Sequence, residues 1–262
     1  MALITLTTDF GIRSAYVPVM KGVILSIAPQ VQILDLTHQI APQNIREVDR
    51  FLGSVLPLFP LNTIHVAVVD PGVGSDRSPL CIDFADFIAI GPDNGLFTQL
   101  LIKYPNAIIR KLNQPQFWRS NISNTFHGRD IFAPVAAHLA NGVKIDQIGE
   151  IIPDCLKLAY SQPTITNNFM TGEIDEIDDF GNIITNLPPL PTPFTHHPNI
   201  RVEIGDQIIS CMPVLTYSKG KENEFLILAS SDNRLEIAIH LQNAANKLNV
   251  KVGNTVTIYF FD

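Results

Sequence analysis

The stretch that decides the fold is TIHVAVVDPG, residues 63–72. The residues before Asp70 are almost all apolar or β-branched, which is typical of a strand whose two faces are both covered. An aspartate, a proline and a glycine then end the strand in a turn. A strand of this kind belongs to a parallel sheet with helices on both faces, so the stretch predicts α/β architecture around it.

Strands and helices alternate on both sides of this stretch. Apolar runs predict strands at 3–8, 31–36, 63–69 and 82–90, and helical spacing predicts helices at 16–27, 44–56, 94–102 and 130–139. The alternation indicates an N-terminal α/β domain with a mainly parallel sheet, over residues 1–160.

The second part of the chain has a different texture. A polar, turn-rich segment at 161–168 is a natural linker. Short strand-like runs follow it, at 172–177, 182–185, 200–204, 208–212, 225–229, 235–240 and 256–260. Glycine, proline, Asp and Asn separate most of them, which predicts a smaller, all-β, barrel-like domain over residues 170–262.

Composition excludes several classes of protein. The 262 residues are 46% hydrophobic and only 16% charged, which is typical of a folded globular chain and not of a disordered one. The net charge of −7 offers no basic field for a nucleic-acid partner. The cysteines Cys81, Cys155 and Cys211 are scattered, which fits neither a disulfide framework nor a zinc knuckle and suits a reducing cytoplasm.

One uncharged run, residues 51–69, has nearly the length of a membrane span. Pro57, Pro60 and polar residues interrupt it, so a buried helix, a proline-marked turn and a buried strand explain it better. The first apolar run has no basic stretch before it and meets Asp9 early, which does not fit a signal peptide. We expect no membrane partner.

Three aspartates follow strand-like runs in the first domain: Asp9, Asp70 and Asp93. Ligands of open parallel sheets bind beyond the carboxyl ends of the strands, so these acids could meet in one crevice. Aspartates also end strands and cap helices for purely structural reasons. Each one alone is ambiguous, whereas the coincidence of three favours a site.

The turn after Asp70 is the most informative segment. DPGVGSDR (70–77) superficially resembles a dinucleotide-binding loop, but Arg77 stands where the third glycine belongs and no helix follows. A tight glycine turn would instead fold Arg77 back onto Asp70. The pair is then either a salt bridge that braces a loop or a carboxylate kept ionised and oriented for chemistry.

His127 lies in a turn with glycine and nearby charge, just before a predicted helix that Asp130 could cap. A lone histidine is more often structural, so its role depends on what lies beside it. Together, Asp70, Arg77 and His127 would form a set that activates water, with a base that titrates near neutrality, a fixed anion and a fixed cation.

Two polar segments of the second domain allow a structural and a functional interpretation. In the acidic segment 172–182, an ordinary hairpin turn is one interpretation, and recognition of a purine edge by Asn182 beside Phe180 is the other. The segment 230–236 is either a polar turn or a holder for a small zwitterion.

Several motifs, in order along nearly the whole chain, resemble those of the S-adenosyl-L-methionine (SAM) hydroxide adenosyltransferases. These SAM hydrolases are related to fluorinating and chlorinating enzymes. The motifs are TTDFG (7–11), MKG (20–22), DLTH (35–38), DPGVG (70–74), PDNG (92–95), FHGRD (126–130) and FGN (180–182). The resemblance implies cleavage of SAM by water into adenosine and L-methionine without a metal or another cofactor.

The resemblance also implies roles for single residues. The catalytic triad would be Asp70, Arg77 and His127. The substrate would be bound by Asp9 at the ribose diol, by Asn182 at the adenine, by Asp178 and Ser231 at the methionine end, and by Glu236 in the pocket. Family members assemble as trimers with the site between subunits, so a homotrimer is expected.

The chain departs from the family pattern at Ser14, Pro18 and Gln242, which leaves the triad untouched but affects the pocket wall. Two other functions remain open. One is a non-catalytic sensor that binds SAM or adenosine in the same pocket. The other is a metal-dependent phosphoesterase built on the aspartates at the strand ends.

Overall fold

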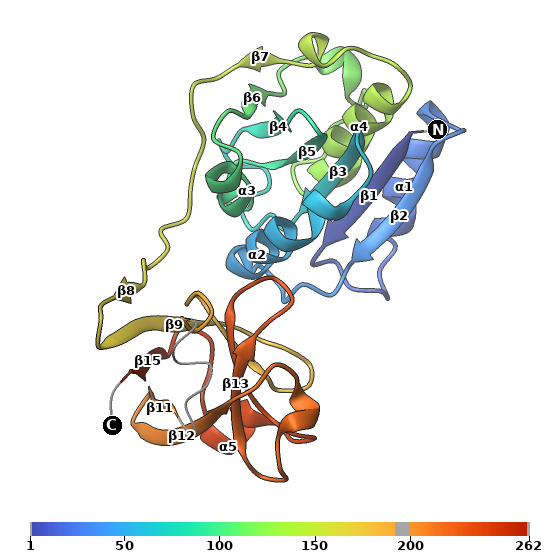
Figure 1. The fold of residues 1–262 in the computed structure, drawn as a ribbon. Coiled ribbons are helices and arrows are strands. Elements are labelled where there is room, and N and C mark those ends of the chain that lie inside the picture. The colour runs from blue at the N-terminus through green and yellow to red at the C-terminus, as the bar shows by residue number, and fades with distance from the viewer. Residues whose placement is uncertain (1, 192–199, 261–262) are drawn as a thin grey trace. The chain divides into compact units, whose positions relative to one another are not determined.

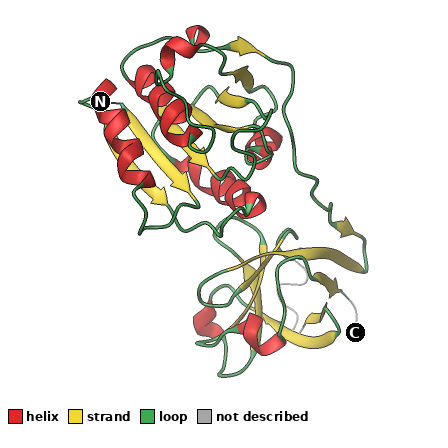
Figure 2. Ribbon diagram, turned by 180° about the vertical axis from the view of Figure 1, so that it is seen from behind, coloured by secondary structure: helices red, strands yellow, loops and turns green. Residues whose placement is uncertain are grey.

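The computed structural model describes residues 2–191 and 200–260 and divides into two compact units, Met1–Leu158 and Ala159–Asp262. The first, called here the α/β unit, mixes helices and strands, whereas the second, the barrel unit, consists mainly of strands (Figure 2). The predicted fold class, α/β followed by an all-β barrel, is confirmed.

A 7-stranded sheet forms the centre of the α/β unit, in the order β2-β1-β3-β5-β4-β6-β7. Its strands are β1 (Leu3–Thr8), β2 (Gln32–Thr37), β3 (Thr63–Val68), β4 (Pro79–Asp83), β5 (Phe87–Pro92), β6 (Ile108–Lys111) and β7 (Glu150–Ile151). The strands β2, β1, β3 and β5 are mutually parallel, while β4, β6 and β7 are joined to the sheet in antiparallel pairs. The sheet is therefore parallel in the half that carries the decisive stretch.

Helices cover both faces of this sheet (Figure 1). They are α1 (Tyr16–Ile27), α2 (Ile45–Val55), α3 (Thr98–Lys103) and α4 (Ala133–Ala140). In β3, Ile64, Val66 and Val68 pack into one core with α1 and α4, whereas Ala67, and Val69 just after the strand, pack into another with α2 and α3. All of β3 is buried, as expected for a strand that is covered on both sides.

The uncharged run at 51–69 contains the end of α2, a short 3-10 turn (Leu56–Leu58) and β3. The interpretation as helix, turn and buried strand is thus confirmed. Within the described residues, no helix has the length and apolar character that crossing a membrane requires.

The expected single strand at 82–90 is wrong. The chain instead forms an antiparallel hairpin of β4 and β5, in which Asp83 faces Ile88. Its turn places Ala85 at φ +69, a left-handed conformation that a residue other than glycine seldom adopts. The amide of Ala85 donates to the Asp83 carboxylate over 2.8 Å, which holds the turn.

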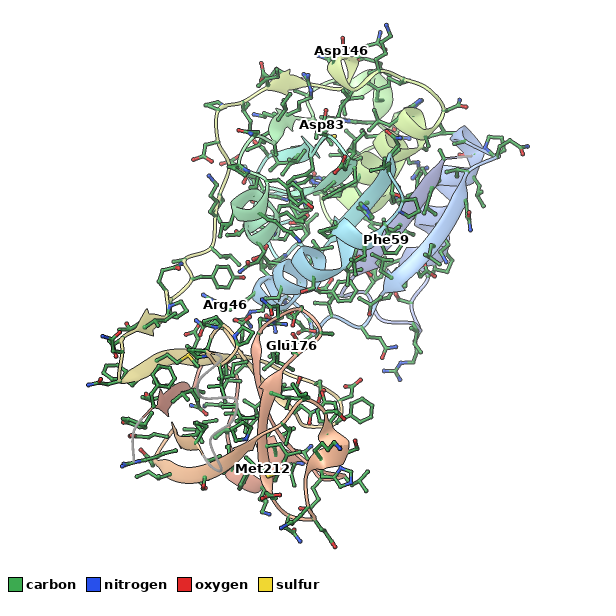
Figure 3. The ribbon with its side chains drawn as sticks, in the orientation of Figure 1. Arg46, Phe59, Asp83, Asp146, Glu176 and Met212 are labelled. Atoms are coloured by element: carbon green, nitrogen blue, oxygen red, sulfur yellow. The ribbon has the colours of Figure 1, made fainter. Side chains whose placement is uncertain are left out.

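The barrel unit is a ring of β-strands that closes where β9 pairs with β10. Its strands are β8 (Thr164–Ile165), β9 (Phe169–Ile177), β10 (Ile183–Thr185), β11 (Ile200–Ile204), β12 (Gln207–Pro213), β13 (Phe225–Ala229), β14 (Leu235–Ile239) and β15 (Thr255–Tyr259). A short helix, α5 (Ala244–Leu248), packs against the core of alternating inward residues. Figure 3 shows Met212 on β12, which packs against a smaller apolar cluster with Leu226.

Candidate functional site

The carboxyl ends of β1, β3 and β5 lie side by side, because these strands are adjacent and parallel. Asp9 follows β1 directly, Asp70 follows β3 after one residue, and Asp93 follows β5 directly. The three aspartates therefore share one edge of the sheet, the edge where ligands of such sheets bind. Their side chains nevertheless have different partners.

Asp70 and Arg77 form a two-point ion pair. Arg77 Nε donates to Asp70 Oδ1 over 2.8 Å, and Arg77 Nη2 donates to the second carboxylate oxygen. The two side chains are only 5% and 8% exposed, respectively. Paired donors of this kind fix both the charge and the direction of a carboxylate.

The turn between the two residues packs against the loop that precedes His127. Gly74 has φ +79, and a Cβ atom on it would lie 2.3 Å from the carbonyl oxygen of Asn124. Glycine is required here on both counts, because the backbone conformation is left-handed and the neighbour is backbone. This close approach brings Arg77 beside His127.

Arg77 Nη2 lies 2.8 Å from His127 Nδ1. A guanidinium group has donors and no acceptor, so the contact requires a lone pair on Nδ1. The neutral imidazole therefore carries its proton on Nε2, an assignment that follows from the hydrogen-bond partner. The pKa of His127 lies below its ordinary value of 6.5, because burial and the Arg77 charge both disfavour a second proton.

His127 precedes a wide π-helical turn (Gly128–Phe132), a type of turn that is frequent at functional sites. Asp130 inside this turn is fully buried and does not cap the helix. Its carboxylate pairs instead with the guanidinium groups of Arg119 and Arg129. Asp130 thus fixes the backbone that carries His127.

Asp9 accepts a hydrogen bond from the backbone N–H of Gln43, 2.9 Å from Oδ2. Within the described part of the chain, no partner is recorded for its other oxygen, Oδ1. Ser14, where the chain departs from the family pattern, contacts the same turn. Its hydroxyl donates to the carbonyl of Phe10, the residue after Asp9, over 3.1 Å. Asp9 is therefore held by one oxygen and can accept from a ligand with the other.

Asp93 has a structural partner. The backbone N–H of Leu156 donates to Asp93 Oδ1 over 2.8 Å, which anchors the segment that leaves the α/β unit. The neighbouring Asn94 donates from Nδ2 to the carbonyl of Val69 over 2.8 Å, directly before Asp70. These two residues tie loops together at the site edge.

In the barrel unit, Asp178 and Asn182 close the hairpin between β9 and β10. Asp178 Oδ1 accepts from the backbone N–H groups of Phe180 and Asn182, and Asp178 Oδ2 accepts from Asn182 Nδ2 over 2.9 Å. The carboxylate therefore fixes which way the Asn182 amide points and leaves Asn182 Oδ1 as an acceptor.

A hollow of about 770 Å³ opens beside this hairpin. It is lined by Asp178, Phe180 and Asn182 and by residues 216–218 and 239–243. Phe180 and Leu241 are 79% and 91% exposed, so the hollow has an apolar rim. The volume and the mixture of apolar walls with few polar groups suit a small organic ligand.

Glu236 lies behind this wall. It is 3% exposed and accepts a hydrogen bond from the hydroxyl of Tyr217 over 2.7 Å. Burial and the nearby Asp178 charge raise the pKa of Glu236, although the Tyr217 bond opposes the shift. Ser231 lies in an exposed turn and is not among the described residues that line the hollow.

Sequence reasoning missed two features here. Tyr217, which links the hollow to Glu236, lies in a polar stretch that gives no signal of its own. Arg234 bonds to Asp175, Glu176 and Asp232, which places a cation among acids next to Ser231. The segment 230–236 contains both an acid and a base, and that combination could have suggested the network.

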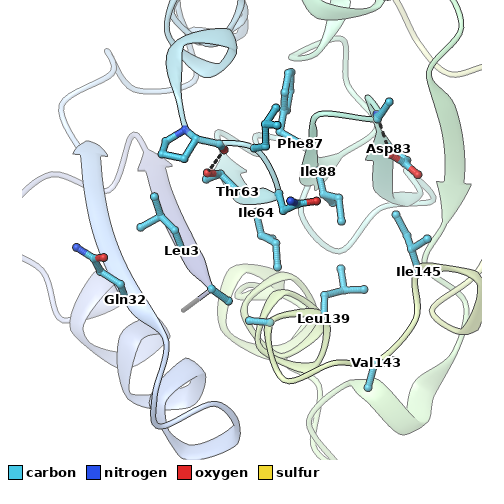
Figure 4. A pocket seen from close by; sticks show the side chains of 16 residues that line it. Leu3, Gln32, Thr63, Ile64, Asp83, Phe87, Ile88, Leu139, Val143 and Ile145 are labelled. Atoms are coloured by element: carbon cyan, nitrogen blue, oxygen red, sulfur yellow. Dashed lines mark hydrogen bonds between the residues drawn. The ribbon is translucent and has the colours of Figure 1, made fainter.

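A second hollow, of about 640 Å³, lies at the amino ends of β1, β3 and β5, the edge opposite the three aspartates (Figure 4). Leu3, Ile64, Ile88 and Leu139 face it. Its polar groups bond locally, as Thr63 Oγ1 does to the carbonyl of Pro60 over 2.6 Å. Its described lining residues include no cluster of charged and imidazole groups like that of Asp70, Arg77 and His127.

Within residues 2–191 and 200–260, no group of three or more His, Cys, Asp or Glu side chains is arranged to hold a metal ion. The three cysteines are free thiols.

Comparison with known proteins covers both units. The family model of the SAM hydroxide adenosyltransferase N-terminal domain matches residues 4–149, and that of the C-terminal domain matches residues 172–257. The (R)-S-adenosyl-L-methionine hydrolase of Methanocaldococcus jannaschii is 35% identical over 98% of this chain and 96% of its own length.

More distant and structural relatives agree with this match. A fluorinase of an Actinoplanes species is 23% identical over 98% of this chain and 97% of its own. An uncharacterized conserved protein from Thermotoga maritima superposes with a TM-score of 0.92 at 34% identity, covering 98% of this chain and 99% of its own. The likeness to a solved structure thus extends over both units.

Proposed function

The chain belongs to the SAM hydroxide adenosyltransferase family, and on this premise we propose that it is an enzyme that hydrolyses SAM to adenosine and L-methionine. The observation that carries the proposal is the buried cluster of Asp70, Arg77 and His127. A carboxylate, a cation and an imidazole held in contact can orient and polarise one water molecule.

The reaction demands little beyond a well-placed nucleophile. The sulfonium makes the ribose 5′ carbon electrophilic. The oxygen of water bonds to that carbon while the carbon–sulfur bond breaks, and its electron pair leaves with sulfur as a neutral thioether. No acid has to protonate the leaving group. Positioning the water in line contributes about 7–11 kcal/mol where the geometry is near ideal.

The cluster divides this work among its three members. Because Arg77 occupies the Nδ1 lone pair, neutral His127 donates from Nε2 and does not accept the water proton. Asp70 is then the acceptor that draws a proton from water, worth about two to four orders of magnitude in rate. Arg77 Nη1 is buried without a hydrogen-bond partner among the described residues, and it supplies a further donor to the developing hydroxide.

The remaining site residues bind the substrate. Asp9 receives the ribose diol on its second carboxylate oxygen, and Asn182 Oδ1 accepts from the exocyclic amine of adenine. Asp178 and Ser231 hold the methionine end, and Glu236 supports the pocket through its hydrogen bond with Tyr217. Asp178 already accepts three hydrogen bonds, which leaves about one further acceptor position for an ammonium group.

The proposal also covers the oligomeric state, the cofactor requirement and the cellular compartment. The chain forms a homotrimer with each site between two subunits, acts without a metal or cofactor, and works in the cytoplasm, where its three thiols stay reduced. Mixing Asp70→Ala with Asn182→Ala subunits under exchange tests the shared site. At SAM concentrations below the raised KM of Asn182→Ala, the mixture regains sites with the parent KM if the two residues serve one site from different subunits, and shows only the raised KM if they do not.

The hydrolysis itself is tested by incubating the purified chain with SAM and chelator and measuring adenosine by chromatography. Asp70→Ala is expected to lower kcat by about two to four orders of magnitude while adenosine still binds. Asp76→Ala, an exposed acid in the same turn, is the matched control and keeps the parent rate. Parent activity in Asp70→Ala, or loss of activity to chelator, contradicts the proposal.

A further inference from the structure

We propose that His38 is a positioning residue for substrate binding, which acts through Thr8 on the turn that carries Asp9. The inference rests on the proposed role of Asp9 at the ribose. It concerns the motif residues Lys21, Asp35 and His38, which the proposed chemistry does not use.

Two hydrogen bonds, one to Thr8 and one to His38, hold the turn after β1 in place. The N–H of Phe10 donates to Thr8 Oγ1 over 3.2 Å, and the N–H of Gly11 donates to the backbone carbonyl of His38 over 2.7 Å. Asp9 lies between these anchored positions. Thr8 is fully buried and His38 is 8% exposed, so bulk water does not compete for these hydrogen bonds.

The side chains behind the turn form one directed chain. Thr8 Oγ1 lies 2.9 Å from His38 Nδ1 and accepts from the N–H of Phe10. When the single imidazole proton is on Nε2, the Thr8 hydroxyl donates to Nδ1. The proton on His38 Nε2 then faces Asp35 Oδ1 at 3.0 Å, a close electrostatic contact with poor hydrogen-bond alignment. Lys21 Nζ reaches the other oxygen of Asp35 at 2.5 Å.

The negative charge of Asp35 favours a proton on His38 Nε2. Partial burial alone would raise the pKa of Asp35, but the contacts with Lys21 and His38 outweigh it and lower the pKa. An ionised carboxylate favours a proton on the adjacent His38 Nε2, and in that single-proton tautomer Nδ1 accepts from Thr8. Three elements, α1, β2 and β1, are thereby linked to one turn.

The far side of the turn is also braced, against the catalytic cluster. Phe10, Tyr16 and Phe126 form an aromatic trio with ring centroids 4.9–5.9 Å apart. Phe126 directly precedes His127. A shift of the Thr8–Gly11 turn would therefore move Asp9 out of the position in which it receives the ribose diol, which weakens substrate binding.

The test compares His38→Ala with His38→Asn, because the Asn side-chain oxygen can lie near the position of Nδ1 and still accept from Thr8. His38→Ala is expected to raise KM for SAM and Kd for adenosine about tenfold, with kcat within about twofold of the parent. His38→Asn is expected to recover most of the affinity. Thr8→Val should weaken binding similarly, and the double variant Thr8→Val/His38→Ala should be no weaker than either single one.

His138→Asn, a half-buried histidine on α4 that packs on Phe117, is the matched control and should change neither constant. Amide exchange at Phe10 and Gly11 should speed up in His38→Ala and not in the control. If His38→Ala lowers Tm but leaves KM and Kd unchanged, the residue is merely structural and the inference is overturned. Additive effects on affinity in the double variant would overturn it as well. If the parent releases no adenosine from SAM, the proposed function fails instead, and adenosine affinity and amide exchange still decide the role of His38.

Discussion

The α/β unit and the barrel unit differ in how completely each one holds its own candidate site residues. In the α/β unit, Asp70 and Arg77 are almost fully buried and bonded at two points, and Arg77 also contacts His127. In the barrel unit, the hollow beside Asn182 is open, and the apolar rim at Phe180 is 79% exposed. The groups that we propose to touch the reacting atoms are preorganised, whereas the groups that we propose to hold the adenine line an open hollow.

This difference predicts that substitutions in the α/β unit change mainly kcat, whereas substitutions in the barrel unit change mainly KM. Preorganised dipoles and charges act mainly on the transition state, so changes among them lower kcat. Contacts to the adenine act on ground state and transition state alike, so changes among them raise KM.

Arg77→Lys should have the largest effect. Arg77 makes these contacts through two nitrogens, Nε and Nη2, and lysine has a single nitrogen that cannot occupy both positions. We expect kcat to fall about a hundredfold or more, with adenosine affinity within about twofold of the parent. Steady-state kinetics and calorimetry measure the two quantities, and Arg13→Lys, on an exposed residue, is the control. A large rise in Kd for adenosine would remove the distinction between the regions.

Gly74→Ala tests whether the close approach of two loops builds the cluster. Gly142→Ala is the matched control, because Gly142 has φ +96 but no atom within 4 Å of the added Cβ. Both variants carry backbone strain, and only Gly74→Ala meets the Asn124 carbonyl. We expect Gly74→Ala to lose about 1–3 kcal/mol more unfolding free energy than the control, and to lose kcat as well. Equal losses in denaturant titrations would show that the approach is unimportant.

Asn182→Ala tests the barrel side. Loss of the acceptor for the adenine amine should raise Kd for adenosine about tenfold and leave kcat nearly unchanged. The parent should prefer adenosine to inosine, whose purine carries an oxygen at that position, and the variant should lose this preference. A variant that still prefers adenosine would show that another group reads the purine edge.

The smallest effect expected concerns pH. In the proposed mechanism His127 acts as a neutral donor, and its pKa is lowered from 6.5 by burial and by Arg77. A base with a depressed pKa stays neutral until the solution becomes more acidic, so kcat should remain level at neutral pH and fall only below pH 6.5. A kcat profile that already falls above pH 6.5 would mean that His127 is not the titrating group or is not shielded by Arg77.

The sequence predicted one side of this comparison better than the other. Asp70 and Arg77 are close in the chain and joined by a glycine turn, so their pairing follows from local geometry. The hairpin of β4 and β5 could not be predicted, because its turn residue Ala85 adopts φ +69 without being Gly, Asn or Asp. Local sequence also hides distant partners, such as the backbone N–H of Leu156 that occupies Asp93.

In the barrel unit the difficulty is greater. Tyr217 lies between β12 and β13 and Glu236 lies on β14, so they meet only once β13 and β14 have paired, and their spacing carries no motif. Asn182 was predicted from a short motif, but the direction of its amide is set by two hydrogen bonds to Asp178, from its backbone N–H and from Nδ2, which the motif does not reveal. Resemblance to the family located residues, and geometry specified what each can donate or accept.

The central claim is that water attacks the ribose 5′ carbon and displaces the methionine thioether. Incubation of the purified chain with SAM in oxygen-18 water, followed by mass spectrometry of the adenosine, measures this directly. The account predicts a single heavy oxygen on the 5′-hydroxyl of every adenosine formed, and none in the methionine. Adenosine without the label, or no adenosine at all, would contradict it.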